Sequence, residues 1–382
     1  MSTQQKSESD TLRDAEKIIR QKNARIALLE KELRSKTFER DSAERIRTEI
    51  YGLSEYSPEP PDWLNQEPKK GTSSSGVPII MLNDWHWGER VDPDQVGGCN
   101  KFNRAIAKRR VRALYETVND LCFNHMTNPN YPGAVVAILG DMITGAIHDE
   151  LAESNDGPVQ ISVLEVEDNL IGLIKGWAER FGKLAVICVP GNHGRNTIRP
   201  RFKNRVFDSY EWNIYQHIER YFRNDPRVSV YVPNEVDAHF SVMGHRFMAT
   251  HGDTLGVKGG DGIIGPLGPI ARGTVKLMRS EASIGRAFDT AIMGHYHFYM
   301  PRGDGCPALV SPSLIGVSEY SRLQLRAPFT RPAQALAFLH HRHGFTAQWP
   351  MYVDGKKLNP KSAPWFVWEG RPIGKPSEPD ME

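Results

Sequence analysis

The chain contains few cysteines and no long apolar run. Its four cysteines, Cys99, Cys122, Cys188 and Cys306, are scattered among 382 residues without a CxxC spacing. This suits reduced buried thiols and argues against a thiolate zinc site. No segment approaches the roughly 18 apolar residues of a membrane span, and the N-terminus has no apolar signal region. We therefore expect a cytoplasmic protein that does not associate with a membrane.

The chain also has little net charge. A formal charge of +2 is too small to indicate a polyanionic partner, so any such argument must rest on local clusters. Hydrophobic residues make up 39% of the chain and charged residues 25%, which is enough apolar material for a large core. Length and composition together predict one sizeable catalytic domain with appendages.

The first appendage is predicted in residues 1–53. Leu12, Ile19, Ile26 and Leu33 recur there at heptad spacing, which predicts a long N-terminal helix resembling a coiled coil. An isolated amphipathic helix is marginal in water, so it needs a partner. That partner is either the chain's own domain or a second copy in a homo-oligomer.

Three further segments follow the predicted helix. Pro, Ser and Gly dominate residues 54–76, which indicates a linker. Residues 77–355 are predicted to form the catalytic domain. Residues 356–382 are rich in Pro and Lys, and we expect this C-terminal tail to wrap the surface or to be disordered.

The catalytic domain alternates strand and helix patterns. The strands VPIIML, GAVVAIL and LAVICV are separated by amphipathic helices at about 101–125 and 159–181, which predicts an α/β fold that begins with a βαβ unit. The later runs VSVYV, HFSVM and RFMAT are short, and we expect them to form mixed or antiparallel strands of a second sheet. The Gly-rich stretch 257–272 is predicted to be a surface loop.

Metal-ligand residues directly follow five of the apolar runs. In open α/β sheets ligands bind beyond the carboxyl ends of the strands, so these side chains are expected to converge. Carboxylates and imidazoles are ligands that Mn²⁺, Fe and Zn²⁺ share. A central carboxylate, for which Asp141 is the candidate, can bridge two ions roughly 3.5–4 Å apart. The residues are Asp84, His86, Asp141, Asn192, His193, His251, His295 and His297.

The motifs DWHWG, GDMITG, GNHG, THGD and GHYH resemble, in order, the five signature blocks of the calcineurin-like metallophosphoesterases. The match spans roughly Val77 to Val353. The resemblance implies the metallophosphoesterase fold, in which two mixed β-sheets form a sandwich flanked by helices, with two divalent metals at its edge. We expect Mn²⁺, with Fe, Zn²⁺ or Ni²⁺ as alternatives.

Carried onto this sequence, the resemblance implies a role for each motif residue. It assigns Asp84, His86 and His297, with Asp141, to one metal. It assigns Asn192, His251 and His295, again with Asp141, to the other. His193 is then left as the catalytic residue, which stabilises the phosphoryl oxygens or protonates the leaving alkoxide.

The sequence departs from two familiar subfamilies. The Ser/Thr protein phosphatases carry Asp and Arg where this chain has Thr144 and Gly145, and an acidic residue is usual where it has Gly194. The nucleases of the superfamily usually carry His in place of Thr144. The helix ahead of the domain resembles phage- and prophage-encoded members described as DNA-repair-exonuclease-like, which is an analogy only.

Two basic clusters bear on the substrate. One lies along the helix at 101–125, with Lys101, Arg104, Lys108 and Arg112 at helical spacing, and is either a binding stripe or a solvated face. The other begins directly after His193, where phosphate contact is expected. From it we take Arg195 and Arg199 as candidate substrate-binding residues.

These features predict a phosphodiesterase that depends on two metals and hydrolyses nucleic-acid or nucleotide phosphodiester bonds through a metal-bridging hydroxide. One alternative is a phosphomonoesterase, including a protein phosphatase. Another is a non-catalytic scaffold that keeps its metals for stability and binds partners through the N-terminal helix. The sequence leaves open whether the substrate is DNA or RNA, and whether cleavage is endonucleolytic or exonucleolytic.

Overall fold

The computed structural model describes residues 21–23, 25–26, 28–29, 59–65, 76–127, 129–147, 151, 154–255, 267–325, 328–355, 366–368 and 371–373. The chain divides into two compact units, Met1–Glu59 and Pro60–Glu382. In the first unit the described residues from 21 to 29 are helical and exposed. Of the predicted heptad positions only Ile26 is described, so the extent of the helix and its self-association stay predictions. Most of the predicted linker likewise lies outside the described residues, but its described part differs from a linker, because Trp63 and Leu64 are buried in the hydrophobic core.

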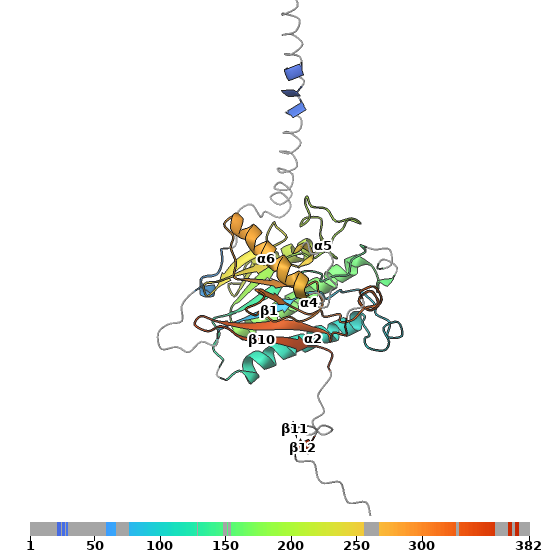
Figure 1. Ribbon diagram of the computed structural model, residues 1–382, viewed down its shortest axis with the longest axis vertical. Helices are drawn as coiled ribbons and strands as arrows, with labels where there is room; N and C mark the ends of the chain where they lie inside the picture. Colours follow the sequence, from blue (N-terminus) through green and yellow to red (C-terminus); the bar gives the residue numbers. More distant parts are fainter. Residues whose placement is uncertain are drawn as a thin grey trace, which may run out of the picture. The chain divides into compact units, whose positions relative to one another are not determined.

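The second unit is built around a six-stranded sheet with the strand order β10-β9-β1-β2-β3-β4 (Figure 1). Strands β1 to β4 run parallel to one another, and β9 and β10 add an antiparallel hairpin on the β1 side. Every residue of β1, β2 and β3 is buried, as expected for parallel strands covered on both faces. The strands are β1 (Val77–Leu82), β2 (Ala134–Ile138), β3 (Leu184–Cys188), β4 (Val228–Tyr231), β9 (Ala333–His340) and β10 (Gly344–Tyr352).

A second sheet of four strands packs against the first. Its order is β5-β6-β7-β8, with an antiparallel β5–β6 pair and parallel pairs elsewhere. Buried residues of both sheets, among them Met81, Ile187, Phe247 and Ile292, form one hydrophobic cluster. The core therefore lies between the sheets. The strands are β5 (Ala238–Val242), β6 (His245–Ala249), β7 (Thr290–Met293) and β8 (Ala308–Val310).

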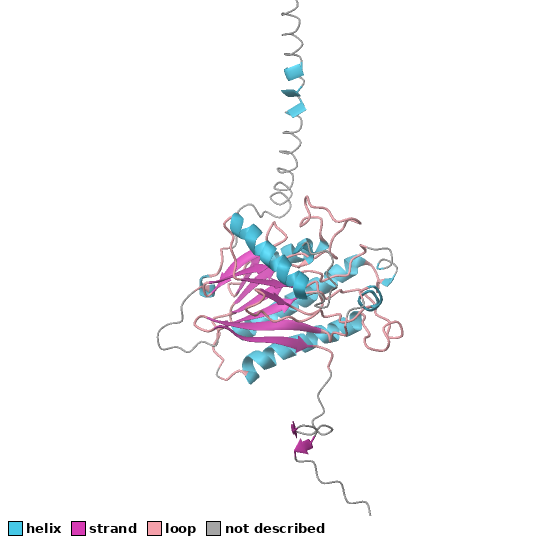
Figure 2. Ribbon diagram, in the orientation of Figure 1, coloured by secondary structure: helices cyan, strands magenta, loops and turns pink. Residues whose placement is uncertain are grey.

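Helices cover the outer faces of both sheets (Figure 2). α2 packs on β10, α4 on β3 and α5 on β4, whereas α6 packs on β8. The predicted fold class, α/β with two mixed sheets flanked by helices, is thus confirmed. The helices are α2 (Arg104–Asp120), which continues into the π-helical turn η3 (Leu121–His125), α4 (Val159–Phe181), α5 (Tyr210–Phe222) and α6 (Leu267–Ser283). The short helical turns are η2 (Asp62–Leu64), η4 (Asp253–Leu255) and η5 (Tyr320–Gln324).

Three expectations about individual segments were wrong or incomplete. The VSVYV run forms β4 of the first sheet and not part of the second, because α5 connects it to β3 and such a crossover returns the chain to the same sheet. Residues 267–272 begin α6, whose Ile270 is buried. In the tail, β11 (Phe366–Trp368) and β12 (Arg371–Ile373) form an antiparallel hairpin.

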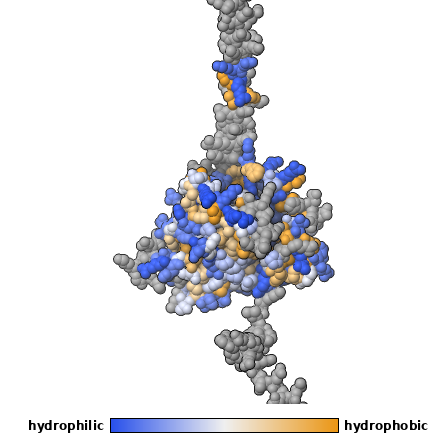
Figure 3. All heavy atoms as spheres, viewed as in Figure 1, coloured by the Kyte–Doolittle hydropathy of each residue, from blue (hydrophilic) through white to orange (hydrophobic). Residues whose placement is uncertain are grey.

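The surface is mostly polar, as the lack of long apolar runs in the sequence predicts. The face drawn in Figure 3 is mostly hydrophilic, with apolar residues scattered over it. None of the helices among the described residues combines the length and apolarity needed to span a bilayer.

Packing between the sheets can be tested at Phe247 on β6. The side chain is 1% exposed and its ring stacks on Phe240, with 5.2 Å between ring centroids. Phe247→Ala should lower the free energy of unfolding by about 3–5 kcal/mol, since it removes a large buried ring and leaves a cavity. Urea unfolding followed by tryptophan fluorescence measures this. The exposed-site control Leu323→Ala should stay within about 0.5 kcal/mol of wild type, and equal losses in the two variants would contradict the packing.

Candidate metal centre

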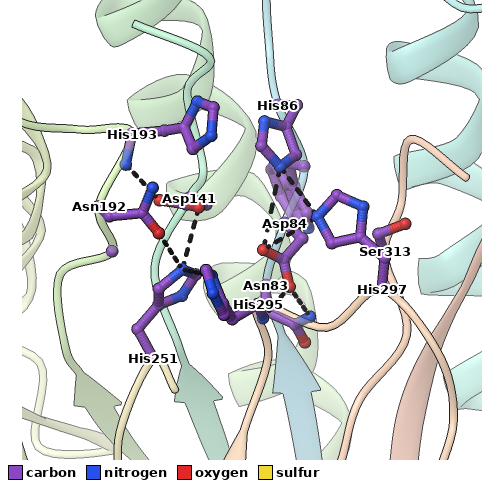
Figure 4. Close-up of polar contacts among 12 residues, drawn as sticks. Asn83, Asp84, His86, Asp141, Asn192, His193, His251, His295, His297 and Ser313 are labelled. Atoms are coloured by element: carbon purple, nitrogen blue, oxygen red, sulfur yellow. Dashed lines mark hydrogen bonds and ion pairs between the residues drawn. The ribbon is translucent and has the colours of Figure 1, made fainter. Parts of the chain in front are cut away.

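The eight motif residues converge at one edge of the two sheets. Each lies shortly after a strand, and backbone hydrogen bonds join the loops that carry them. The Asp84 N–H donates to the Gly140 carbonyl at 3.0 Å, and the Gly294 N–H donates to the His251 carbonyl at 3.1 Å. Parallel strands end at the same edge of a sheet, which explains why segments far apart in sequence meet here. Figure 4 shows the side chains in two neighbouring groups.

The first group contains Asp84, His86 and His297. Nε2 of His297 lies 3.4 Å from Oδ1 of Asp84 and 3.1 Å from Nε2 of His86. Nε2 of His86 is 3.9 Å from the same carboxylate oxygen. Ligand atoms that share one ion at about 2.1 Å lie roughly 3.0–3.4 Å apart. The two distances from His297 fall within this range, and all three atoms are close enough together to hold a divalent ion.

The second group contains Asp141, His251 and His295, with Asn192 beside them. Nε2 of His251 is surrounded by Oδ2 of Asp141 at 2.9 Å, Oδ1 of Asn192 at 3.1 Å and Nδ1 of His295 at 3.2 Å. Nδ1 of His251 donates to the Leu139 carbonyl at 2.8 Å. That bond fixes the tautomer and leaves Nε2 free to act as a ligand.

His193 lies between the two groups. With His86 and Asp141 it forms a third set of ligand atoms close enough to share an ion. The His86 and His193 rings meet edge to face, with 4.6 Å between centroids. Nδ1 of His193 lies 3.0 Å from the Thr144 carbonyl, which can only accept, so Nε2 is the ring nitrogen available to the site. Its assignment as a catalytic residue and not a ligand stays a prediction.

The two carboxylates are buried and tightly held. The Asp84 Oδ2 accepts from Asn83 Nδ2 at 2.6 Å and from the His295 N–H at 2.7 Å. Its Oδ1 is buried without a hydrogen-bond partner, which leaves that atom available to an ion. The Asp141 Oδ1 accepts from the His193 N–H at 2.6 Å. Each aspartate is therefore fixed by backbone donors on one side and open to the site on the other.

Electrostatic shifts in the site follow from burial and from these pairings. Burial raises the pKa of Asp84, but His297 and His251 outweigh it and lower the pKa to about 2. Burial lowers the pKa of His251, but Asp141 outweighs it and the pKa rises. Asp84 raises the pKa of His297 in the same way. Burial and the charge of His251 lower the pKa of His295 to about 4.

Backbone strain is concentrated in the same residues. Seven non-glycine residues of the described ranges have a positive φ, a conformation that costs roughly 1–3 kcal/mol at each such residue. Five of the seven are predicted ligands, with φ between 47° and 67°: Asp84, His86, Asp141, His295 and His297. Such strain persists only where the surrounding structure enforces it, and it clusters at functional sites.

Two motif glycines lie so close to the carboxylates that a side chain there would clash with them. A Cβ added at Gly191 would collide with the Asp141 carboxylate, and one added at Gly294 would lie 2.5 Å from Oδ2 of Asp84. Any side chain at these positions would displace a predicted ligand. The glycines of the GNHG and GHYH motifs are therefore required for close approach as well as for turning the chain.

Sequence reasoning missed Glu211, which joins two of the ligand loops. This buried side chain on α5 accepts from the Met142 N–H at 2.6 Å and from the Gly191 N–H at 2.7 Å. Its carboxylate lies against Gly194, where a Cβ would be 2.7 Å from Cδ of Glu211. Burial and the charge of Asp141 raise its pKa to about 7. A glutamate in a helix that carries no motif gives no sequence signal for this role.

Sequence reasoning also missed a polar clamp at the end of β1. Gln334 of β9 is fully buried and its Oε1 accepts from the Asn83 N–H at 2.9 Å and from Trp85 Nε1 at 3.1 Å. Its Nε2 donates to the Asn83 carbonyl at 3.1 Å and to the Pro312 carbonyl at 2.7 Å. The clamp holds the chain on either side of Asp84. β9 lies about 250 residues from β1 along the chain, so the pairing is invisible in the sequence.

The basic residues divide into engaged and free side chains. Arg104 and Lys108 of α2 both pair with Glu165 of α4, which favours a structural role for part of that stripe. Arg195 donates to the carbonyls of Asn192 at 2.7 Å, Thr197 at 3.0 Å and Ile198 at 3.3 Å. Its guanidinium thus holds its own loop, whereas Arg199 is exposed.

No family model and no curated protein matches the chain. Among solved structures it is similar to a dimetal phosphatase from Danio rerio, with 10% identity, 73% of this chain and 100% of that chain covered, and a TM-score of 0.34. It is also similar to a sulfate thiohydrolase, SoxB, from Thermus thermophilus (10% identity, 75% and 57% covered, TM-score 0.29). A third is a phosphopantetheinyl hydrolase from Mycobacterium tuberculosis (11% identity, 66% and 94% covered, TM-score 0.27).

Glu211 offers a test of how the ligand loops are held. Glu211→Ala leaves the buried N–H groups of Met142 and Gly191 without acceptors, at about 1–3 kcal/mol each. It should therefore destabilise the chain and weaken divalent-ion binding. Glu211→Gln retains one acceptor and should lose less. Urea unfolding and calorimetric titration with Mn²⁺ measure the two effects, and an alanine variant as stable as wild type would refute the role.

Proposed function

We propose that this chain is a phosphodiesterase that uses two divalent metal ions and acts on nucleic acid or nucleotides. The observation that carries the proposal is the meeting of two carboxylates, five imidazoles and one amide from five loops at a single sheet edge. Their ligand atoms fall into sets that lie within 4.8 Å of one another, close enough to share an ion. A cluster of this kind is costly to bury without a function, because it gathers strained backbone and charged groups in one place.

The residues present fit a pair of ions. Asp84, His86 and His297 would hold one ion and Asn192, His251 and His295 the other, with Asp141 between them. Oδ1 of Asp84, which accepts no hydrogen bond, and Nε2 of His251, which faces Asp141, Asn192 and His295, support this assignment. Two ions in such a site supply Lewis-acid neutralisation of phosphoryl charge and lower the pKa of water. All the ligand atoms are N or O, which suits Mn²⁺ among several metals.

His193 is the residue that we assign to proton transfer. Because its Nδ1 donates to the Thr144 carbonyl, Nε2 faces the site as the atom that exchanges a proton with the leaving oxygen. Burial lowers the pKa of His193, although Asp141 opposes this effect. An anionic phosphate beside the ring would favour the protonated form, which is the form that a general acid needs.

The preference for a diester follows from the engaged arginines. A monoester dianion is commonly gripped by a guanidinium fork. Arg195 uses its donors on backbone carbonyls, and Arg205 pairs with Asp253. Neither guanidinium has its donors free to bind a dianionic monoester. The site therefore favours a phosphodiester, which carries a single negative charge. Exposed Arg199 remains the candidate for contact with a more distant phosphate.

Turnover of two synthetic substrates tests the reaction class. With Mn²⁺, the wild-type chain should hydrolyse bis(p-nitrophenyl) phosphate faster than p-nitrophenyl phosphate, measured as nitrophenolate release. His193→Ala should lower kcat for the diester by roughly 10²–10⁴-fold and should retain both ions. Asp141→Asn should lose metal and activity together.

Each alternative function predicts a different outcome. Turnover of the monoester alone would replace the proposal with a phosphomonoesterase. If neither substrate nor DNA or RNA were cleaved while the chain bound two ions, a metal-stabilised scaffold would replace it. A partner would then be sought through residues 1–53.

Metal removal gives a second test that does not depend on turnover. Chelation should lower the thermal unfolding midpoint, since ions that bind only the folded state stabilise it. Elemental analysis after reloading should find two ions per chain. His297→Ala should reduce this count to about one, because His297 belongs to one group only. A count of one in wild type would contradict the dinuclear centre.

A further inference from the structure

The segment that follows His193 forms a loop closed at its base. Arg195 and Ser209 form an isolated β-bridge, and the Asn196 N–H donates to the Asp208 carbonyl at 3.0 Å. The Tyr210 N–H donates to the Gly194 carbonyl at 2.8 Å. The loop thus leaves the site at Gly194 and returns to it at Tyr210, the first residue of α5.

Two arginines fix the sides of this loop. Arg195 binds the carbonyls of Thr197 and Ile198 on the outgoing side. On the returning side, Arg205 forms an ion pair with Asp253, which lies in η4 two residues after His251. The loop is therefore anchored to the third and the fourth motif and holds a defined position beside the site.

The tip of the loop, residues 198–204, is exposed throughout. Ile198 is 83% exposed and Phe202 97%, the largest values among the exposed large hydrophobic residues of the described chain. Such side chains are normally buried. Because Phe202 packs against almost nothing in its own chain, its ring contributes little to folding and is available for a ligand.

Three cations stand beside these apolar side chains. Arg199, Arg201 and Lys203 alternate with them along the tip and are all exposed. No acidic side chain in the described part of the chain forms an ion pair with any of the three. The tip therefore presents an aromatic face inside an uncompensated positive field.

An aromatic ring surrounded by free cations suits a strand of unpaired nucleotides. Bases stack on aromatic side chains, and phosphates are neutralised by Lys and Arg. In a duplex the base faces are already stacked on one another, so Phe202 would find no partner there. An anionic lipid surface would satisfy the cations, but two apolar side chains give only a small area for insertion.

We propose that residues 198–204 bind single-stranded nucleic acid, with Phe202 stacked on a base and Arg199, Arg201 and Lys203 contacting phosphates. The proposal rests on the phosphodiesterase function above, because the loop begins directly after His193. It deepens that function by naming the form of the substrate and a docking point outside the metal centre.

Fluorescence anisotropy with labelled oligothymidylate tests the tip, using full-length Asp141→Asn chain to prevent cleavage. In that background Phe202→Ala should weaken binding by roughly tenfold, and Phe202→Trp should retain it. Replacing Arg199, Arg201 and Lys203 together with Ala should flatten the slope of log affinity against log salt by about two. Tyr320→Ala, at another exposed aromatic residue, is the matched control and should bind as its parent does.

Three results would overturn the tip as a single-strand site. The first is equal oligonucleotide binding by Phe202→Leu and its parent, and the second is equal affinity of the parent for a duplex of the same length. The third is that the loop substitutions weaken binding to anionic phosphatidylserine vesicles and leave binding to the oligonucleotide unchanged. Thermal unfolding midpoints should be alike in all loop variants, which excludes misfolding as the cause of lost binding.

The same experiments separate the two proposals. If wild type hydrolyses bis(p-nitrophenyl) phosphate while Phe202→Ala does not change oligonucleotide affinity, the tip proposal fails alone. If Phe202→Ala weakens oligonucleotide binding while wild type leaves the small diester intact, the phosphodiesterase proposal fails alone.

Discussion

The burial of two carboxylates at the edge between the sheets is the constraint on which the site depends. Asp84 and Asp141 are almost completely inaccessible to water, and a buried charge is tolerated only when it is paired and hydrogen-bonded. Backbone N–H groups of His295 and His193 satisfy one oxygen of each carboxylate. The remaining negative charge must be balanced by protons on the surrounding imidazoles or by cations between them.

These two ways of balancing the charge exclude each other. Asp141 and Asp84 raise the pKa of His251 and His297, respectively, so a proton on each imidazole compensates its neighbouring carboxylate. The same ring nitrogens are the ones that face the other ligand atoms. A divalent ion must therefore displace these protons, and ion binding is coupled to proton release. Exchange of protons for an ion would keep the buried carboxylates compensated in both states.

Much of the fold and the convergence of the ligands could be read from the sequence, because both depend on local patterns. Continuous apolar runs mark β1, β2 and β3, and the 3.6-residue period marks α2 and α4. The position of Asp84 or His251 directly after such a run is also local information. The rest depends on pairings between distant segments. Gln334 reaches Asn83 only because β9 happens to lie beside β1, and Glu211 reaches Gly191 through a helix without a motif. The engagement of Arg195 with its own loop depends equally on tertiary structure.

This chain has Gly145 and Gly194 where the Ser/Thr protein phosphatases carry an arginine and an acidic residue. Both glycines have a steric basis in this chain. Gly145 has a φ of 67°, and a Cβ there would collide with the His193 carbonyl. An arginine at this position would thus push away the loop that carries His193, so this chain cannot hold the arginine that the protein phosphatases carry there. At Gly194 the space for a side chain is taken by Glu211, which supplies a carboxylate from α5 instead. With both positions restricted to glycine, neither the second nor the third motif can place a longer side chain at these two points. The loop between Arg195 and Ser209 leaves the site at Gly194 itself and carries exposed cations, which is why we propose the substrate contacts there.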